Sequence, residues 1–363
     1  MVKDNKDFNM ELLNAIAPSG YEKPSVDVFD KHMEKNGCVR VIHDKMYNSA
    51  WRFGTDDKAV PNIMDKKAIL IEAHIDSCSF LVSNLTQDGY VNVIPQGGID
   101  KKVVQGQSFY IYNKDGKRFR AICPKDPIHI ETKEQRDRID DISCMTLDCG
   151  CSSLTELKEV TGIDVGDIVV YANDCFEYDF GVKGKYIVSQ NLDDKAGVMC
   201  VYDLAKRISK EFTSQLTDKY DIIFAVTGSE ETGTRGAVQL AQELRCNYVI
   251  SIDCTFANNN SYAKYGNINT GKGAVINFSP ASNREFSRDL QDAARRNCVC
   301  HQLQATPPCG TNINAFQMYM PCCSTALVSY PLESMHTPVE KVCWSDLDAV
   351  VDTIIAWLRD IEQ

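Results

Sequence analysis

Apolar positions along the chain follow two periodicities, and their order predicts the layout of the fold. Nearly continuous apolar runs are typical of strands buried on both faces, and they occur at residues 67–76, 220–225, 248–252 and 326–331. Amphipathic spacing predicts helices at residues 10–16, 23–35, 198–212 and from Arg235 onward, and shorter strands are expected at residues 38–42 and 50–53. Helices that alternate with buried strands indicate an α/β domain.

Between residues 77 and 175 the pattern changes to short alternating segments separated by glycine-rich turns. Strands are expected at residues 90–94, 108–112 and 165–170, with one helix at residues 153–160 closed by Gly162. The alternation of helix and strand resumes after Tyr186. We therefore expect a β-rich inserted domain at residues 77–175, which splits an α/β domain made of residues 1–76 and 176–363.

Composition places the chain among ordinary globular proteins. Its residues are 44% hydrophobic and 25% charged, and its length of 363 residues is enough for a large core and two domains. A net charge of -11 argues against a nucleic-acid partner and favours divalent cations. The first residues are polar, and no stretch approaches the roughly 20 apolar residues of a membrane span. We expect a cytoplasmic protein without a membrane partner.

Sixteen cysteines stand out in this composition. Cys149-x-Cys151, Cys298-x-Cys300 and the Cys322-Cys323 pair do not have the spacing of a zinc ribbon. A chain of this length does not need disulfides to stabilise its core. We expect free thiols in a reducing compartment.

Two adjacent acids, Glu230 and Glu231, follow the apolar run at residues 220–225 and precede the helix at Arg235. Neighbouring residues that leave a strand point in different directions, so one carboxylate could bind a metal while the other moves a proton. Taken alone, the pair is more typical of a solvated helix start, where acids are favoured by the helix dipole.

Other metal-type side chains lie at similar positions. His74 and Asp76 end the run at residues 67–76, and a His-x-Asp pair on an extended segment shares one face, although such pairs are common by chance. Asp193 precedes the helix at residues 198–212, which it or Asp194 could simply cap. Asp253 is expected at the end of the strand at residues 248–252, and His336 follows the strand at residues 326–331.

Together these stretches resemble the M42 aminopeptidases, a family within the metallopeptidases that use two metal ions. The segments that carry the resemblance are Ala73–Asp76, Gln96–Asp100, Leu147–Gly150, Val165–Asp167, Leu192–Gly197, Glu230–Ala237 and His336–Pro338. The likeness covers nearly the whole chain. It implies an α/β/α metallopeptidase domain with a mixed sheet, and a β-barrel-like insert at residues 77–175 that serves dimerisation.

The resemblance also implies roles for individual residues. The metal ligands it implies are His74, Asp193, Glu231, Asp253 and His336. Asp193 would bridge two ions, with His74 and Asp253 on different ones. Asp76 would orient His74, and Glu230 would be the general base.

One histidine and carboxylate oxygens for each ion suit zinc first, with cobalt or manganese as alternatives. Two such ions fit the removal of N-terminal amino acids from short peptides through attack by an activated water. The resemblance further implies a homo-oligomer built from dimers, a tetrahedral particle of twelve subunits.

Several residues depart from the family pattern. Ser77, Ser79 and Lys195 replace the usual residues around the ligands, Asn312 replaces an aspartate, and Glu333 replaces an arginine ahead of His336. We take Asn312 and Glu333 as candidate substrate-binding residues. An acid at Glu333 would disfavour substrates with N-terminal Glu or Asp; the alternative is a surface glutamate paired with a lysine.

Two other functions are alternatives to an aminopeptidase. An M20-like deacylase usually carries its lid after the acidic pair, whereas this insert precedes Glu230. A non-catalytic scaffold could use the insert for assembly, but it would not need all seven candidate ligand and catalytic positions to keep reactive side chains.

Overall fold

The computed structural model describes residues 1–61, 66–178, 181–182, 184–212, 214–258, 264, 266–307 and 310–363. These form two compact units. The sheet unit comprises Met1–Ser77, Cys175–Met335 and Glu340–Gln363. The barrel unit comprises Cys78–Asp174 and His336–Val339.

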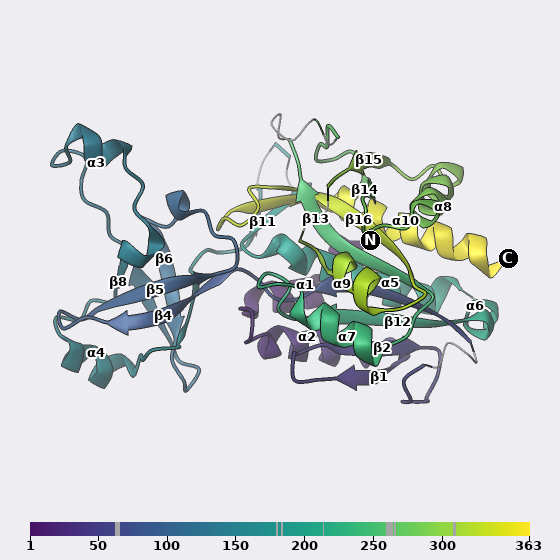
Figure 1. Cartoon of the computed structure of the whole chain (residues 1–363), viewed down its shortest axis with the longest axis horizontal. Helices are drawn as coiled ribbons and strands as arrows, with labels where there is room; N and C mark the ends of the chain where they lie inside the picture. The colour runs from purple at the N-terminus through teal and green to yellow at the C-terminus, as the bar shows by residue number, and fades with distance from the viewer. Residues whose placement is uncertain are drawn as a thin grey trace. The chain divides into compact units, whose positions relative to one another are not determined.

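A large mixed sheet forms the centre of the sheet unit (Figure 1). Its main path runs β1-β2-β12-β3-β13-β16-β17-β11-β10, and β14 joins β15 to β16. The strands are β1 (Cys38–His43), β2 (Ser49–Phe53), β3 (Lys67–His74), β10 (Phe176–Glu177), β11 (Tyr186–Ser189), β12 (Tyr220–Thr227), β13 (Tyr248–Phe256), β14 (Ala274–Phe278), β15 (His301–Ala305), β16 (Ser324–Glu333) and β17 (Glu340–Cys343). β12, β3, β13 and β16 are mutually parallel neighbours, which places their carboxyl ends at one edge.

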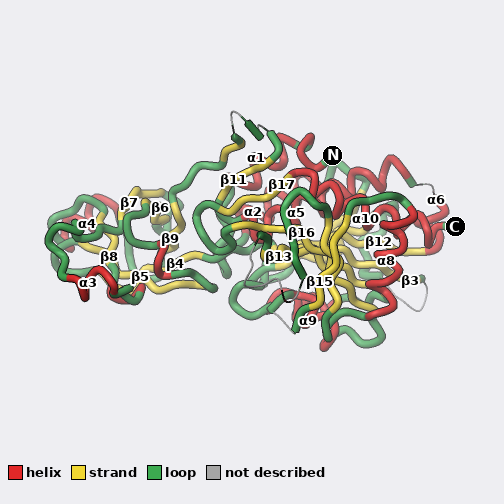
Figure 2. The backbone as a smooth tube through the Cα atoms, turned by 90° about the horizontal axis from the view of Figure 1, so that it is seen from above, coloured by secondary structure: helices red, strands yellow, loops and turns green. Residues whose placement is uncertain are grey.

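Helices cover both faces of this sheet, and Figure 2 shows the yellow strands between red helices. The helices are α1 (Lys6–Asn14), α2 (Lys23–Met33), α5 (Leu192–Glu211), α6 (Ser214–Lys219), α7 (Arg235–Glu243), α8 (Arg284–Arg296), α9 (Asn312–Tyr319) and α10 (Trp344–Glu362). Ile69 and Ile71 of β3 pack into the cluster with α5 and α10, whereas Ala68 and Leu70 pack toward α7 and α9. The strand alternation therefore supplies two separate cores, as expected for a strand buried on both faces.

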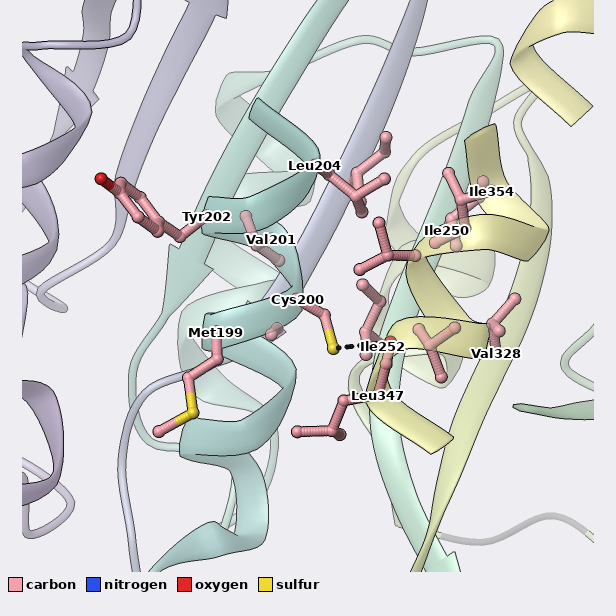
Figure 3. Close-up of a cluster of buried hydrophobic side chains, with 14 of the residues drawn as sticks. Met199, Cys200, Val201, Tyr202, Leu204, Ile250, Ile252, Val328, Leu347 and Ile354 are labelled. Atoms are coloured by element: carbon pink, nitrogen blue, oxygen red, sulfur yellow. Dashed lines mark hydrogen bonds between the residues drawn. The ribbon is translucent and has the colours of Figure 1, made fainter. Parts of the chain in front are cut away.

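The larger of these cores lies under α5 and α10 (Figure 3). Leu204 of α5 and Ile354 of α10 face Ile250 of β13, and all three are fully buried. The Cys200 thiol lies 3.7 Å from the Leu347 carbonyl oxygen, which it reaches as a weak donor. Burial of an aliphatic side chain such as Leu204, Ile250 or Ile354 stabilises the folded state by roughly 1.5–3 kcal/mol.

The barrel unit closes six strands into a barrel in the order β4-β5-β8-β7-β6-β9. The strands are β4 (Ser79–Leu85), β5 (Tyr90–Gln96), β6 (Ser108–Tyr112), β7 (Arg118–Ile122), β8 (Thr146–Asp148) and β9 (Ile168–Tyr171), accompanied by α3 (Lys133–Asp137) and α4 (Leu154–Thr161). Its interior is aromatic: Phe109 stacks on Tyr171 at 5.0 Å, and Phe80 meets both edge-on. Closure leaves no long unpaired strand edge in this barrel.

The predicted α/β class is confirmed, with corrections at element boundaries. α5 begins at Leu192, six residues before the predicted start, and α1 begins at Lys6 instead of residue 10. α4 matches its prediction closely, with Ser153 accepting from the Glu156 N–H and Gly162 ending the helix at φ +65°. Every described cysteine is a free thiol, as predicted. No helix in the described ranges is both long and apolar enough to cross a membrane.

Candidate metal centre

Three adjacent parallel strands bring the candidate residues to one edge of the sheet. His74 is the last residue of β3 and pairs with Thr227, the last residue of β12, after which the chain continues to Glu230. On the other side of β3, β13 carries Asp253. Asp253 lies inside β13, which continues to Phe256, so the prediction that this strand ends before Asp253 is wrong. Carboxyl ends of parallel strands are where α/β proteins place their sites.

His74 and two nearby aspartates form a cluster of three potential metal donors. The His74 Nε2 atom lies 3.1 Å from Asp193 Oδ1 and 4.0 Å from Asp253 Oδ1. One ligand atom from each of these three residues lies within 4.8 Å of the others. Glu230 Oε2 is also 4.0 Å from His74 Nε2. Together with Glu230, the cluster therefore places carboxylates from three separate segments around one imidazole.

Asp76 connects this cluster to the acidic pair. Its Oδ1 accepts a hydrogen bond from the Glu230 N–H at 2.8 Å, and its Oδ2 accepts from the Glu231 N–H at 3.2 Å. Ser19 Oγ donates a further bond to Oδ2 at 2.6 Å. The Asp76 Oδ1 atom lies 3.4 Å from His74 Nδ1, and the Asp76 carbonyl oxygen lies 3.1 Å from the same nitrogen. Asp76 thus fixes both the imidazole and the backbone that presents the two glutamates.

Asp194 fastens the start of α5 to β3. Its Oδ2 accepts from the His74 N–H at 3.2 Å, and its Oδ1 accepts from Tyr330 Oη at 2.7 Å and from the Gly197 N–H at 3.1 Å. The last bond is the cap that the sequence suggested for Asp193 or Asp194. A Cβ at Gly197 would collide with the Asp194 carboxylate, so this approach requires glycine.

Burial dominates the electrostatics of the cluster. It raises the pKa of Glu230 well above its usual value; the charge of His74 opposes this shift, and Asp253 adds to it. Burial likewise raises the pKa of Asp253 to about 6. For His74, burial lowers the pKa, but hydrogen bonds to Asp193 and Asp76 reverse the effect and leave it well above the usual value. A positive charge nearby, such as a divalent ion, would favour the ionised form of these buried carboxylates.

The donor set fits a divalent ion. His74, Asp193 and Asp253 offer one nitrogen and carboxylate oxygens, the mixture that zinc, cobalt or manganese accept. Asp76 lies beside Nδ1 of the His74 imidazole, and a carboxylate at this position is a common second partner of metal-bound histidines. We therefore take these three residues as the ones that would hold metal.

The other two ligands implied by the resemblance lie in different settings. Glu231 follows Glu230 in the sheet unit, and its N–H is bound by Asp76. His336 belongs to the barrel unit, where its Nδ1 lies 2.6 Å from the Gly98 carbonyl oxygen. A carbonyl partner requires a proton on Nδ1, which leaves Nε2 as the nitrogen with a lone pair. The ligand roles of Glu231 and His336 stay predictions.

The two candidate substrate-binding residues are both held by other side chains. Glu333 Oε2 forms an ion pair with Lys341 Nζ at 2.8 Å, and its Oε1 accepts from Asn258 and Thr270. Asn312 is 2% exposed and donates to Glu72 Oε2 at 3.1 Å and Thr227 Oγ1 at 2.7 Å. Glu333 thus has the lysine partner of the alternative interpretation, and burial restricts Asn312 to an indirect role; selection of substrate by either residue stays a prediction.

Two residues that depart from the family pattern are buried near the cluster. The Lys195 ammonium donates to the Ala15 carbonyl oxygen, and burial lowers its pKa to about 7. Ser77 donates its N–H to the Ala17 carbonyl at 2.8 Å and its hydroxyl to the same oxygen at 3.3 Å. Lys195 therefore ties the start of α5 to the loop after α1, and Ser77 ties the segment after β3 to the same loop.

Sequence reasoning missed the residues that position this centre. Tyr330 also donates to the Leu192 carbonyl at 2.6 Å, and Glu340 accepts from the Asp193 N–H at 3.1 Å. Ser19 binds Asp76 from the loop after α1. Each partner is separated from its target by more than 50 residues, and no local sequence pattern predicts such a contact.

A mixed sheet with helices on both faces and a histidine–carboxylate cluster at its carboxyl edge is the arrangement that the resemblance implies for a metallopeptidase domain. The family model described as M42 glutamyl aminopeptidase matches residues 59–353, and the chain belongs to this family. The chain is 24% identical to lysyl aminopeptidase of Pyrococcus furiosus, covering 97% of this chain and 96% of that protein. It is 26% identical to glutamyl aminopeptidase of Lactococcus lactis, covering 72% and 69%.

Solved structures share the fold. An aminopeptidase from the archaeon Desulfurococcus kamchatkensis has a TM-score of 0.85 at 22% identity, covering 100% of this chain and 98% of that chain. The TET1 peptidase of Pyrococcus horikoshii has a TM-score of 0.81 at 24% identity, covering 97% and 98%. The structural work on that protein describes assembly into a tetrahedron or a large octahedral shell.

Proposed function

We propose that the chain is an aminopeptidase that removes N-terminal residues from short peptides with the help of two divalent metal ions, zinc first. The observation that carries this proposal is the cluster of His74, Asp193 and Asp253 beside Glu230. Membership of the M42 family and the names of the relatives support the same reaction.

The metal ions, when bound, would polarise the scissile carbonyl and lower the pKa of the attacking water. His74 would coordinate through Nε2, because Nδ1 faces the carbonyl and carboxylate oxygens of Asp76. Asp193 reaches toward the imidazole from the start of α5, and Asp253 from β13. The proximity of Asp193 to both His74 and Asp253 supports its predicted role as the bridging carboxylate.

Glu230 is the group that moves the proton in this proposal. Its Oε2 would accept a proton from the attacking water and return it to the leaving amine. Burial raises the pKa of Glu230, which suits a group that must be protonated and deprotonated near neutral pH. Asp76 holds the Glu230 backbone, so the carboxylate starts from a fixed position.

A paired substrate experiment tests the function. The metal-loaded protein should release leucine from Leu-Gly-Gly and leave N-acetyl-Leu-Gly-Gly intact, because the reaction requires a free N-terminal amine. His74→Gln should lose metal and activity, whereas His129→Gln, which changes an exposed histidine of the barrel unit, should keep both. Cleavage of the acetylated peptide alone would support a deacylase, and no hydrolysis of either peptide by a zinc-, cobalt- or manganese-loaded sample would support the scaffold.

We also propose that the chain assembles into a homo-oligomer, as described for the Pyrococcus horikoshii relative. Closed symmetric assemblies are the common outcome when one surface of a chain recognises a copy of itself. Light scattering at micromolar concentration should report a mass many times that of one chain. A monomer under those conditions would exclude the proposal.

A further inference from the structure

A cavity of about 580 Å³ lies between α8 and the β14–β15 strand pair in the sheet unit. Its walls include Arg284, Arg288 and Gln291 of α8, together with Phe278 and Leu303 from the strands. A cavity of this size matches those that bind small molecules.

The cavity lies away from the candidate metal centre. Val275 of β14 and Asp253 of β13 both pair with Ser329 of β16, so these residues form one row across the sheet. β14 runs antiparallel to β16, and Phe278 lies three residues beyond Val275, toward the end of the sheet at which β13 and β16 begin. At about 3.3 Å per residue, this places the wall at Phe278 roughly 10 Å along the strands from the Asp253 row.

Helical spacing explains why the polar side chains converge. Residues 284, 288 and 291 are related by i, i+4 and i+7, so they share one face of α8. The adjacent face, with Phe286 and Leu290, packs into the core. The pocket-facing stripe is therefore fixed in orientation by a buried anchor.

Charge in this cavity is positive in a protein whose net charge is -11. Neither Arg284 nor Arg288 has an ion-pair or hydrogen-bond partner among the described residues, and no acidic residue lines the wall. By contrast, Arg295 and Arg296 farther along α8 pair with Asp292 and Asp360. Guanidinium groups without a carboxylate partner are the side chains best suited to bind carboxylate or phosphate oxygens.

A buried amide provides the second observation. Gln291 is 8% exposed, yet within the described part of the chain its side chain has no hydrogen-bond partner. Because Gln291 lines the cavity, the small surface that remains accessible opens into it. The amide of Gln291 is therefore held in place by its burial while its polar atoms stay available to hydrogen-bond a ligand in the cavity.

Two hydroxyl groups complete the polar wall. Ser279 Oγ and Ser282 Oγ lie 3.2 Å apart, so one donates to the other. The hydroxyl hydrogen of the accepting serine is not used in this bond and can donate to a ligand. Phe278 and Leu303 supply the apolar part.

We propose that this cavity binds a small organic anion, whose carboxylate or phosphate is bound by Arg284 and Arg288 and whose apolar body packs against Phe278 and Leu303. Gln291 and the serine pair contribute hydrogen bonds to the polar atoms of the ligand. The site is distinct from the candidate metal centre and does not depend on peptide hydrolysis.

Isothermal titration calorimetry on the metal-loaded protein tests this, with phenyl phosphate, phenylacetate, inorganic phosphate and uncharged benzyl alcohol as probes. Either aromatic anion should bind more tightly than inorganic phosphate, and benzyl alcohol should not bind measurably. The stronger of phenyl phosphate and phenylacetate identifies the anionic group. Arg284→Gln and Arg288→Gln should each weaken binding by about tenfold or more, because each removes a charge-assisted contact.

Arg295→Gln is the matched control, since it removes an exposed arginine of the same helix that does not line the cavity. It should leave the affinity unchanged. Gln291→Leu, of similar volume, should weaken binding while keeping the melting temperature. Absence of binding by both aromatic anions at about 10 mM, where a cavity with two arginines should already be occupied, would overturn the proposal. Equal losses in Arg288→Gln and Arg295→Gln, or affinity that neither Arg284→Gln nor Arg288→Gln changes, would overturn it as well.

Discussion

The Asp76 carboxylate accepts the backbone N–H of Glu230 at 2.8 Å, across 154 residues of chain. The sequence suggested only that Asp76 orients His74. The observed contact adds a second task, because the same carboxylate fixes the loop that presents the acidic pair. The position of Glu230, the proposed proton-transfer group, and the position of the His74 imidazole therefore depend on one side chain.

Asp76→Asn tests whether this side chain positions Glu230. An amide at this position offers one acceptor where the two glutamate N–H groups and Ser19 now find two oxygens. We expect kcat to fall on the order of 100-fold, because a displaced Glu230 no longer meets the water in a productive geometry. Steady-state kinetics on Leu-Gly-Gly check this. Asp88→Asn, an exposed change in the barrel unit, is the control, and equal kinetics in both variants would contradict the assigned role.

The two adjacent glutamates should respond differently to the same substitution. Glu230→Gln should retain near-stoichiometric metal and lose on the order of 100-fold or more in turnover, since it removes a base and no ligand. Glu231→Gln should instead lose metal. Elemental analysis of dialysed samples together with turnover measures both effects. Equal metal loss in the two variants would show that the roles are assigned wrongly.

Stability should depend on pH through Glu22, a buried carboxyl that accepts from the Gly20 N–H and from both the N–H and hydroxyl of Ser229. Burial raises its pKa from 4.5 to about 7. Because the folded state binds this proton more tightly than the unfolded state, the contribution of Glu22 to stability is full below pH 4.5. It decreases as pH rises and is lost above about 7.

Glu22→Gln, which mimics the protonated carboxyl, should therefore be insensitive to this titration. The wild-type protein should lose stability relative to the variant between about pH 4.5 and pH 7, by up to roughly 3 kcal/mol. Melting temperatures of both proteins across that range give the difference, in which the titration of other groups cancels. A difference that stays constant, or that reverses in sign, would contradict the raised pKa.

Substrate preference should reflect the acid at Glu333. We expect low kcat/KM for N-terminal Glu or Asp, with neutral or basic residues preferred, because like charges in a partly desolvated pocket repel. The Lys341 ion pair weakens this field, so Lys341→Met should increase discrimination against Glu while Glu333→Gln should reduce it. A panel of Glu-, Leu- and Lys-terminated peptides measures the effect. A clear preference of the wild-type protein for Glu would eliminate the idea.

Periodicity predicted the central strands well because their burial is enforced on both faces. Ala68 and Leu70 pack on one side and Ile69 on the other, so burial on both faces requires apolar side chains at most positions of β3. The start of α5 was harder to predict, since Asp193 and Asp194 have non-helical backbone angles inside its first turn. That turn is fixed by long-range contacts and not by local propensity.

The candidate metal-binding residues could be predicted from the sequence, but the residues that position them could not. His74 and Asp253 follow or end strong apolar patterns. Tyr330 lies 136 residues from Asp194, and Glu340 lies 147 residues from Asp193. Only the folded sheet brings such partners together, because a hydrogen bond between distant segments leaves no periodic signal in the sequence.

Anomalous diffraction from crystals of the zinc-loaded protein tests the central claim most directly. We predict two zinc peaks about 3.5–4 Å apart. Asp193 should contact both ions, with His74 on one and Asp253 on the other, at ligand distances of about 2.0–2.2 Å. A cluster of His74, Asp193 and Asp253 that contains no zinc peak, or one peak only at full zinc loading, would contradict it.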